Sequence, residues 1–224
     1  MALASIFDTQ PPNDPNARIA AEVERQGYAV VPNFFSTAEV DALLQLFHNL
    51  RQQENALQPA GIGRGGDYQT NDFVRQDWIH WLDGTTQPTQ LFLDRMRDLQ
   101  VTLNRRLIMG LFDYEAHFAL YPDGAFYKKH LDAFQGQSNR RLSTVLYLNY
   151  DWQPTDGGEL RCYDPDEPSQ VLFDLAPLAG TLVVFESERF WHEVLPAKRR
   201  RFSIAGWFRI NTSTSTRVDP PLWL

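Results

Sequence analysis

The chain of 224 residues lacks several features that mark large classes of proteins. No stretch reaches the roughly 18 consecutive apolar residues of a membrane-spanning helix. The start, Met1–Asp8, has neither the basic residues nor the long apolar core of a secretory signal. A single cysteine, Cys162, excludes an intrachain disulfide and fits a reducing compartment. We therefore expect a soluble cytoplasmic protein in which Cys162 is a packed or half-exposed strand residue and not a nucleophile.

The chain also has no surplus of positive charge. Its formal net charge is −7, so a phosphate backbone is repelled unless basic residues gather in one groove. The one short basic run, Lys198–Arg201, is better explained as a solvated turn that ends in an inward-facing arginine. We expect neither nucleic acid nor a membrane as partner. The sequence leaves the oligomeric state open, and we favour a monomer.

The first half of the chain is predicted to be mostly helical. Residues 1–15 read as a loose lead-in, and Ser36 with Glu39 forms a capping box at the start of a helix. Leu91 is expected on the buried side of the last helix in this half. The predicted elements are helices over 16–26, 37–53 and 88–109 and strands over 28–35 and 73–82, the second of these at a sheet edge.

The second half changes character, because short runs of strand formers alternate with turn residues. Such spacing is typical of a β-sandwich or barrel. We therefore expect one domain over 16–224, with helical support over 16–110 and a β core over 111–212. The predicted strands cover 115–121, 127–132, 141–149, 158–163, 181–186, 192–194 and 202–210.

A glycine-rich segment, Gly61–Gly66, interrupts the first half. It could be taken for a phosphate-binding loop, but no preceding strand and no P-loop lysine frame it. A mobile loop is the better interpretation. Residues 61–70 are glycine-rich enough to act as a lid over a site.

His130, Asp132 and His192 are the candidate metal ligands. Residues two apart on a strand point to the same face, so His130 and Asp132 are expected to point together. This pair alone is a weak signal, but His192 follows a second apolar strand, Thr181–Phe185. Two imidazoles and one carboxylate can occupy one face of an octahedral Fe(II). That leaves positions for a bidentate co-substrate and O2.

Arg201 strengthens this interpretation. On a strand it shares a face with Ser203, Ala205 and Trp207, and Tyr147 lies on another strand of the same half. A buried dicarboxylate needs a cation, arginine binds carboxylates in bidentate fashion, and a tyrosine hydroxyl can add a hydrogen bond. The pattern suggests a 2-oxoglutarate oxygenase. The other histidines, His117 among them, are expected to be packed or surface residues.

Further short motifs surround these residues. They are Tyr121–Gly124, Tyr127–Asp132, Tyr147–Asn149, Gly157–Leu160 and His192–Ala197, with Val74–Gly84 upstream. In combination they resemble the iron- and 2-oxoglutarate-dependent dioxygenases, above all prolyl hydroxylases of the hypoxia-inducible-factor type and their bacterial relatives. The resemblance covers roughly residues 28–210. It implies a mainly β fold, a double-stranded β-helix or jelly roll, with supporting N-terminal helices.

The resemblance also implies roles for single residues. His130, Asp132 and His192 look like the iron ligands, and Arg201 and Tyr147 look like anchors of the distal carboxylate of 2-oxoglutarate. By resemblance, the pocket walls are Tyr121, Leu160 and Trp207, and the residues that meet the substrate are Arg75, Asp77 and Tyr127. Arg75 and Asp77 could instead be exposed charges on an edge strand.

The activity that the resemblance implies is 4-hydroxylation of a prolyl residue in a target protein, with elongation factor Tu as the candidate target. The reaction would use Fe(II), 2-oxoglutarate and O2, with ascorbate as the expected reductant, and release succinate and CO2. Three alternatives stay open. They are a small-molecule hydroxylase, a nucleic-acid demethylase, which the acidic charge disfavours, and a non-catalytic iron or oxygen sensor.

One residue departs from the family pattern. In the family that this chain resembles, animal members carry a threonine four residues after the arginine, near the metal-bound water. This chain has Ala205 there. A hydroxyl that could hold the water is missing, so we expect water to leave the iron more easily and O2 to react faster.

Overall fold

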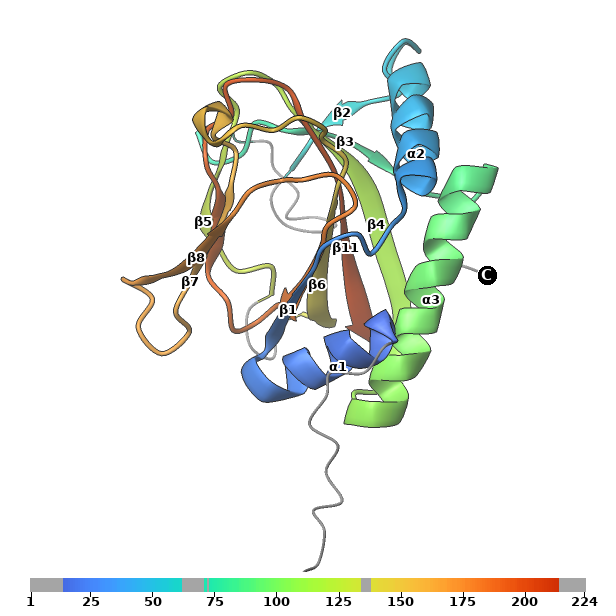
Figure 1. Cartoon of the computed structure of the whole chain (residues 1–224), viewed down its shortest axis with the longest axis vertical. Coiled ribbons are helices and arrows are strands. Elements are labelled where there is room, and N and C mark those ends of the chain that lie inside the picture. The colour runs from blue at the N-terminus through green and yellow to red at the C-terminus, as the bar shows by residue number, and fades with distance from the viewer. Residues whose placement is uncertain (1–13, 62–70, 72, 134–137, 214–224) are drawn as a thin grey trace, which may run out of the picture.

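Two antiparallel sheets lie side by side, and the helices pack on the larger of the two (Figure 1). The computed structural model describes residues 14–61, 71, 73–133 and 138–213. Most of the expected lead-in and nearly all of the expected glycine-rich lid therefore lie outside the described residues. Within the described part of the chain, no helix is both long and apolar enough to cross a membrane.

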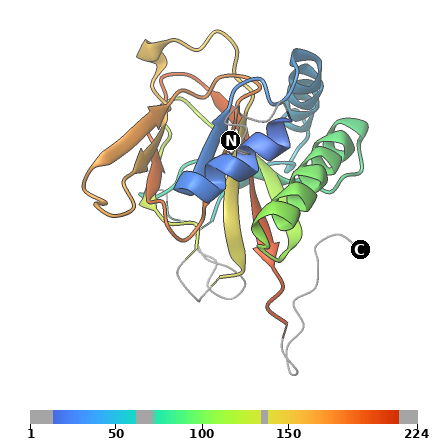
Figure 2. The same cartoon turned by 60° about the horizontal axis from the view of Figure 1, so that its bottom comes forward.

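The helices begin and end close to the predicted positions. They are α1 (Pro15–Gln26), α2 (Thr37–Leu50) and α3 (Gln87–Leu107). The capping box at the start of α2 is confirmed, because the backbone N–H of Ser36 donates to Glu39 Oε2 over 2.7 Å and the serine Oγ accepts from the glutamate N–H. The α1 and α3 helices lie side by side (Figure 2).

The larger sheet runs in the order β1-β9-β6-β11-β4-β3-β2, and every neighbouring pair is antiparallel. Its longest strands, β4 and β11, pair along almost their whole length. The strands are β1 (Tyr28–Val31), β2 (Gln58–Pro59), β3 (Trp78–Trp81), β4 (Leu111–Tyr121), β6 (Arg140–Tyr147), β9 (Leu182–Glu186) and β11 (Arg201–Ile210).

The smaller sheet runs in the order β5-β10-β7-β8 and is also antiparallel. Its strands are β5 (Tyr127–His130), β7 (Leu160–Tyr163), β8 (Val171–Leu175) and β10 (His192–Val194). The sequence did not predict β8, because this outer strand has no alternation of buried and exposed residues. The two-sheet arrangement confirms the predicted jelly roll.

The boundary between support and core differs from the expected one at residue 110. Strands β1, β2 and β3 precede that position, yet they belong to the larger sheet of the core. The predicted strand over 73–82 is shorter, because only Trp78–Trp81 pairs as a strand. It is not the edge either, since β2 lies outside it.

One apolar cluster joins the helices to the larger sheet. Phe47 of α2 stacks on Phe118 of β4, with ring centroids 4.4 Å apart. Phe92 of α3 is buried, whereas Leu91 is 53% exposed, so the prediction that Leu91 faces the core is wrong. Neighbouring helical residues point about 100° apart, so only one of the two can face the sheet, and the aromatic ring does so.

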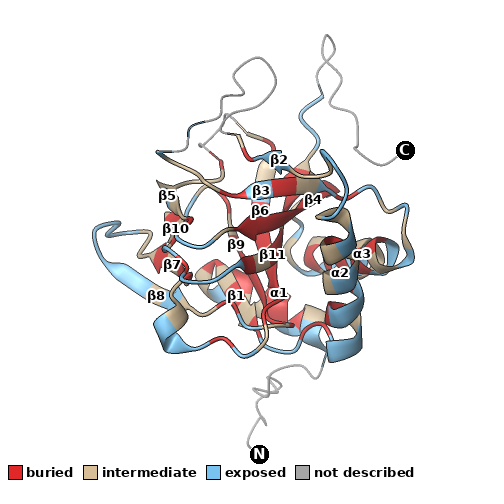
Figure 3. Cartoon of the chain, turned by 90° about the horizontal axis from the view of Figure 1, so that it is seen from above, coloured by how far each residue is buried: buried red, intermediate tan, exposed pale blue. Residues whose placement is uncertain are grey.

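The sheets together enclose the region that holds the candidate site. Viewed from above, buried segments of β9, β6, β11 and β4 form the centre, while β8 and the outer faces of α2 and α3 are exposed (Figure 3). Strand register sets which side chains meet there. Arg201 on β11 pairs with Tyr121 on β4, and His192 on β10 pairs with His130 on β5.

Candidate metal centre

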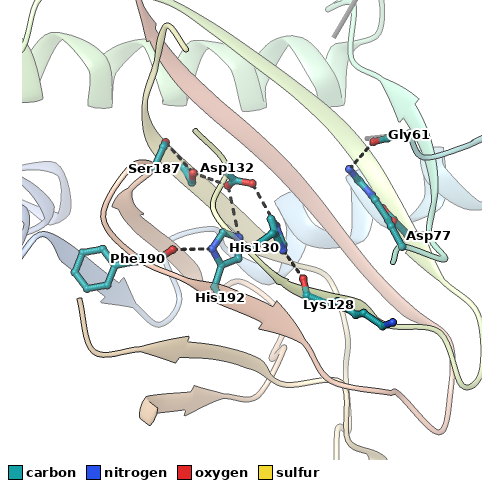
Figure 4. A network of polar contacts seen from close by, with 10 residues as sticks. Gly61, Asp77, Lys128, His130, Asp132, Ser187, Phe190 and His192 are labelled. Atoms are coloured by element: carbon teal, nitrogen blue, oxygen red, sulfur yellow. Dashed lines mark hydrogen bonds and ion pairs between the residues drawn. The ribbon is translucent and has the colours of Figure 1, made fainter. Parts of the chain in front are cut away.

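His130, Asp132 and His192 meet at one point between the sheets (Figure 4). His130 Nε2 lies 3.5 Å from Asp132 Oδ1, and His192 Nε2 lies 3.7 Å from Asp132 Oδ2. One potential ligand atom from each residue lies within 4.8 Å of the other two. Three nitrogen and oxygen ligands on one side of an ion leave further coordination positions open. This donor set suits a non-haem Fe(II) centre.

Asp132 reaches the centre by a route that differs from the expected one. Strand β5 ends at His130, so Asp132 lies in the bend that follows and not on the strand as predicted. Its carboxylate accepts a hydrogen bond from Ser143 Oγ on β6 over 2.6 Å. Ser143 is linked to Ser187 over 2.9 Å, so the larger sheet holds the carboxylate in place.

Each histidine is oriented by a backbone carbonyl two residues before it. His130 Nδ1 lies 2.7 Å from the carbonyl oxygen of Lys128, and His192 Nδ1 lies 3.0 Å from that of Phe190 (Figure 4). A carbonyl oxygen only accepts, so Nδ1 carries the proton in both rings. The Nε2 lone pairs are therefore left for a metal ion.

The charge states of the centre also favour metal binding. Burial alone would raise the pKa of Asp132, but the two imidazoles and Arg140 hold it well below its usual value. Burial, with nearby His130, lowers the pKa of His192 to about 4. At neutral pH the carboxylate is charged and the His192 imidazole is neutral, which are the forms that bind a metal ion.

A pocket adjoins the three residues, and both sheets contribute to its wall. Of the residues predicted for the site, Tyr147 and Asp77 lie outside the lining, and the others lie in it. The lining comprises Arg75, His117, Ala119, Tyr121, Tyr127, His130, Asp132, Thr144, Val145, Leu160, His192, Val194, Arg201, Ser203, Ala205 and Trp207.

Arg201 is a buried cation at one side of this pocket, with 1% of its surface exposed. Its Nε donates to the Gly158 carbonyl over 2.9 Å and its Nη1 donates to Ser203 Oγ over 3.2 Å. Among the described residues no carboxylate pairs with it. A buried charge is costly unless an opposite charge compensates it, so the site fits a ligand carboxylate.

Tyr147 lies beside this arginine and is also fully buried. The Arg201 guanidinium lies 5.1 Å from the centre of the Tyr147 ring, and the tyrosine hydroxyl has no hydrogen-bond partner in the described structure. Burial raises the pKa of Tyr147, so the hydroxyl keeps its proton and can donate a hydrogen bond. An orphaned donor next to an uncompensated cation fits the distal carboxylate of 2-oxoglutarate.

The predicted pocket walls are all present. Tyr121 lies under the Arg201 guanidinium, 5.0 Å from the ring centre, and Leu160 is buried in the lining. Trp207 is covered by the guanidinium of Arg140 at 3.5 Å from the ring centre, which holds the indole against the pocket.

Arg75 and Asp77 form a buried bidentate ion pair. Arg75 Nε and Nη2 donate to the two carboxylate oxygens of Asp77 over 2.6 and 2.9 Å. The alternative that these are exposed charges on an edge strand is therefore wrong. The Arg75 guanidinium lies 4.7 Å from the centre of the Tyr127 ring, so all three residues predicted to meet the substrate form one group.

His117 is a pocket residue that the sequence did not reveal. The expectation that it is packed or on the surface is met, since it is buried, but its ring also lines the pocket. It pairs with Ala205 across β4 and β11 and lies between Trp81 and Trp207, with ring centroids 5.0 and 5.4 Å away. Alternation along β4 could have found it, because His117 lies on the same strand face as Ala119 and Tyr121, which also line the pocket.

The tautomer of His117 follows from one contact. Its Nδ1 lies 3.1 Å from the carbonyl oxygen of Phe118, so Nδ1 donates and Nε2 is left as an acceptor. Burial, together with the charge of Arg75, lowers the pKa of His117 to about 3. The pocket therefore contains a neutral imidazole at physiological pH.

Comparisons with known proteins identify the family. Residues 116–209 match the 2OG-Fe(II) oxygenase superfamily. A crystal structure of a prolyl-4-hydroxylase from Pseudomonas putida is 40% identical, with a TM-score of 0.77, and the match covers 87% of this chain and 98% of that one. This chain belongs to the 2OG-Fe(II) oxygenase superfamily. The oxygenase therefore uses Fe(II), 2-oxoglutarate and O2.

Curated relatives of the oxygenase include prolyl hydroxylases. A hypoxia-inducible factor prolyl hydroxylase of Caenorhabditis elegans is 30% identical over 201 residues, which cover 81% of this chain and 26% of the relative. Human Egl nine homolog 1 is 32% identical over 60% of this chain and 33% of its own length. The chain thus spans a quarter to a third of these relatives. The findings support an oxygenase of the prolyl hydroxylase type.

A further structural match agrees in fold. A prolyl hydroxylase from Trichoplax adhaerens, solved with a peptide fragment of the hypoxia-inducible factor oxygen degradation domain, has a TM-score of 0.77 at 24% identity. The match covers 87% of this chain and 88% of that one. At this identity the likeness shows the jelly-roll fold.

Proposed function

We propose that the oxygenase hydroxylates a prolyl residue, at its 4 position, in a target protein. The observation that carries this proposal is the buried Arg201–Tyr147 pair beside the three candidate ligands. It occurs in a chain that is 40% identical to a prolyl-4-hydroxylase over nearly the whole of that structure. The pair suits a co-substrate with a second carboxylate, and the similarity suggests the target chemistry.

In this proposal His130, Asp132 and His192 hold Fe(II). Bound iron, with 2-oxoglutarate and O2, supplies oxidative decarboxylation that gives succinate and CO2 and is coupled to hydroxylation of a C–H bond. The protein's part is to hold three ligands with fixed tautomers and to leave the remaining positions open. Ascorbate is proposed as the reductant that keeps the iron in its ferrous state.

Arg201 and Tyr147 would fix the co-substrate from the other end. The guanidinium already uses Nε on the Gly158 carbonyl and Nη1 on Ser203, so its orientation is set before any ligand binds. A preorganised cation loses little conformational freedom on binding and holds the ligand in one pose. Leu160 and Trp207 line the same pocket and would exclude water from the reacting atoms.

The rim of the site suits a large substrate. Trp81 contacts the pocket residues His117 and Trp207, yet 42% of its surface is exposed. An aromatic side chain that is half in the site and half in solvent can contact a chain that extends beyond the pocket. This observation favours a peptidyl substrate over a metabolite that is enclosed completely.

Elongation factor Tu is the proposed target, on the strength of the resemblance to bacterial prolyl hydroxylases. The direct test incubates purified elongation factor Tu with the oxygenase, Fe(II), 2-oxoglutarate and ascorbate, and maps the products by peptide mass spectrometry. The matched control is Asp132→Ala. We expect one added oxygen on a specific proline with the wild type and none with the variant.

A bacterial lysate treated in the same way separates the target from the reaction. Modification of a proline in another protein would overturn the assignment to elongation factor Tu and leave prolyl hydroxylation standing. Succinate formation with small metabolites, and no modified protein, would overturn prolyl hydroxylation in favour of a small-molecule hydroxylase. No turnover with any substrate, despite bound iron, would point to a sensor.

A further inference from the structure

The ring of Tyr127 lies flat against the imidazole of His130. The ring centroids are 3.5 Å apart and the planes differ by 18°. Tyr127 is the first residue of β5 and His130 is the last, so the strand brings its own tyrosine onto the candidate ligand that it carries. This is the one near-parallel stack that involves a candidate ligand among the described residues.

A metal-binding imidazole needs two restraints. The hydrogen bond from His130 Nδ1 to the Lys128 carbonyl fixes which nitrogen is free, but it allows the ring to rock about that bond. A flat stacking partner removes this second freedom. His192 has an equivalent arrangement, because its Nδ1 bonds to the Phe190 carbonyl and its ring meets Phe185 edge to face at 4.7 Å.

The two histidines differ in how much else surrounds them. His192 is buried, and its ring packs edge to face on the buried core residue Phe185. His130 is only partly buried, with 15% of its side chain exposed. Its other ring contact is His192 itself, with centroids 4.2 Å apart. Tyr127 is therefore the one non-ligand ring that restrains His130 in the described structure.

The tyrosine is itself held by the buried ion pair. The Arg75 guanidinium lies 4.7 Å from the Tyr127 ring centre and is fixed by the bidentate contact with Asp77. The backbone supports this arrangement, since Arg75 and Tyr127 form an isolated antiparallel bridge. Neighbouring hydrogen bonds run from Gln76 N to Phe126 O and from Lys128 N to Val74 O.

We propose that Tyr127 is a positioning residue for the metal centre, with its ring held by Arg75 and in turn holding the His130 imidazole in its ligating orientation. This inference rests on His130 being an iron ligand in the proposed function. It assigns a role to the ring of Tyr127 that is separate from any contact between its hydroxyl and a substrate.

Two substitutions distinguish these roles. Tyr127→Phe keeps the flat ring and removes the hydroxyl, whereas Tyr127→Leu removes the ring. If the ring positions His130, Tyr127→Phe should retain metal binding and Tyr127→Leu should weaken it. Loss of residues that orient metal ligands typically weakens metal affinity by about 10- to 100-fold. If instead the hydroxyl meets the substrate, Tyr127→Phe should be the variant with impaired turnover.

The measurement uses Co(II) alone as the probe, titrated into the full chain without co-substrate and followed by its visible absorption. We expect Tyr127→Leu to weaken Co(II) binding by about tenfold and to alter the spectrum, with Tyr127→Phe close to wild type. Tyr150→Leu is the matched control, because Tyr150 is a partly buried tyrosine that bonds to Asp41 of α2, away from the pocket.

Tyr127→Met provides a second ring-free variant of greater length if the leucine variant does not fold, and thermal unfolding checks both. Wild-type Co(II) affinity and spectrum in a folded ring-free variant would overturn the positioning role and leave the proposed function intact. If the wild-type chain bound no Co(II), the metal assignment itself would fail, and the positioning role with it.

Discussion

The guanidinium of Arg201 lines the pocket and lies 5.1 Å from the centre of the buried Tyr147 ring, which lies behind the lining, and in the described structure neither residue has an acidic partner. The pair comes from two neighbouring strands, since Tyr147 on β6 pairs with Ser203 on β11. A charge and a donor that are both uncompensated in the protein indicate a carboxylate ligand.

Arg201→Ala should raise the 2-oxoglutarate concentration needed for half-maximal turnover by about a hundredfold, because it removes a charge-assisted bidentate contact. Tyr147→Phe should raise it by about tenfold, since it removes one hydrogen bond. Steady-state succinate formation measures both. Arg199→Ala is the matched control, because this exposed arginine bonds to Asp151 and Asp156 outside the pocket. If Arg199→Ala raised the 2-oxoglutarate requirement more than Arg201→Ala, the assignment of Arg201 as the carboxylate anchor would be contradicted.

Asp132→Ala should abolish iron-dependent turnover, and so should His192→Ala. Two remaining ligands cannot hold the ion in an open three-ligand site. Metal content after dialysis and succinate formation provide the measurement. Asp174→Ala, which breaks an exposed ion pair with Arg161, serves as the control and should keep both the bound metal and succinate formation. Full activity in either ligand variant would show that the metal binds elsewhere.

Much of this site could be predicted from sequence, because a few residue types carry the chemistry. Arg201 shares one face of β11 with Ser203, Ala205 and Trp207, as period-two alternation predicts, and all four line the pocket. The meeting of His130 and His192 needed more than periodicity. It depends on the register of β5 against β10.

Most features that the sequence predicted wrongly or missed also depend on contacts between segments that are distant in the chain. Asp132 lies beyond the end of β5, where Ser143 of the larger sheet donates a hydrogen bond to its carboxylate, a contact that no local pattern records. The burial of Arg75 with Asp77 depends on packing against Tyr127, and β8 has an exposure pattern without strand alternation. His117 is different, because alternation along β4 puts it on the same face as Tyr121 and could have predicted its place in the pocket.

Acid should destabilise the protein partly through His117. Its pKa is about 3 in the folded chain against 6.5 for an ordinary histidine, so the unfolded chain binds the proton first. The stability from the neutral ring is present above pH 6.5 and is lost as the pH falls from there toward about 3. At about pH 5 the loss should reach about 2 kcal/mol.

Urea unfolding of wild type and His117→Gln at about pH 7 and about pH 5 measures this loss. The wild type should lose about 2 kcal/mol more than the variant over this range. Glutamine is uncharged throughout and keeps a polar atom near the position of Nε2. Equal losses in the two proteins would show that the His117 ring is not held neutral by burial.

Ala205→Thr should slow the reaction with O2. The added hydroxyl can hold a water molecule near the metal, and water must leave before O2 reacts. Stopped-flow measurement of the O2-dependent step, with substrate and 2-oxoglutarate bound, checks this prediction. Ala205→Val is the matched control, because valine has a similar shape and no hydroxyl. An unchanged rate and O2 dependence in Ala205→Thr would contradict the idea.

In the proposed function, one site couples 2-oxoglutarate decarboxylation to oxygenation of a prolyl residue. The most direct test supplies isotopically labelled O2 and compares the labelled oxygen on the target proline with the succinate formed, in wild type and in Asp132→Ala. We expect one labelled oxygen on one proline for each succinate, and neither product from the variant. Succinate without a labelled proline in any target protein, or an oxygen on proline that does not depend on Asp132, would contradict it.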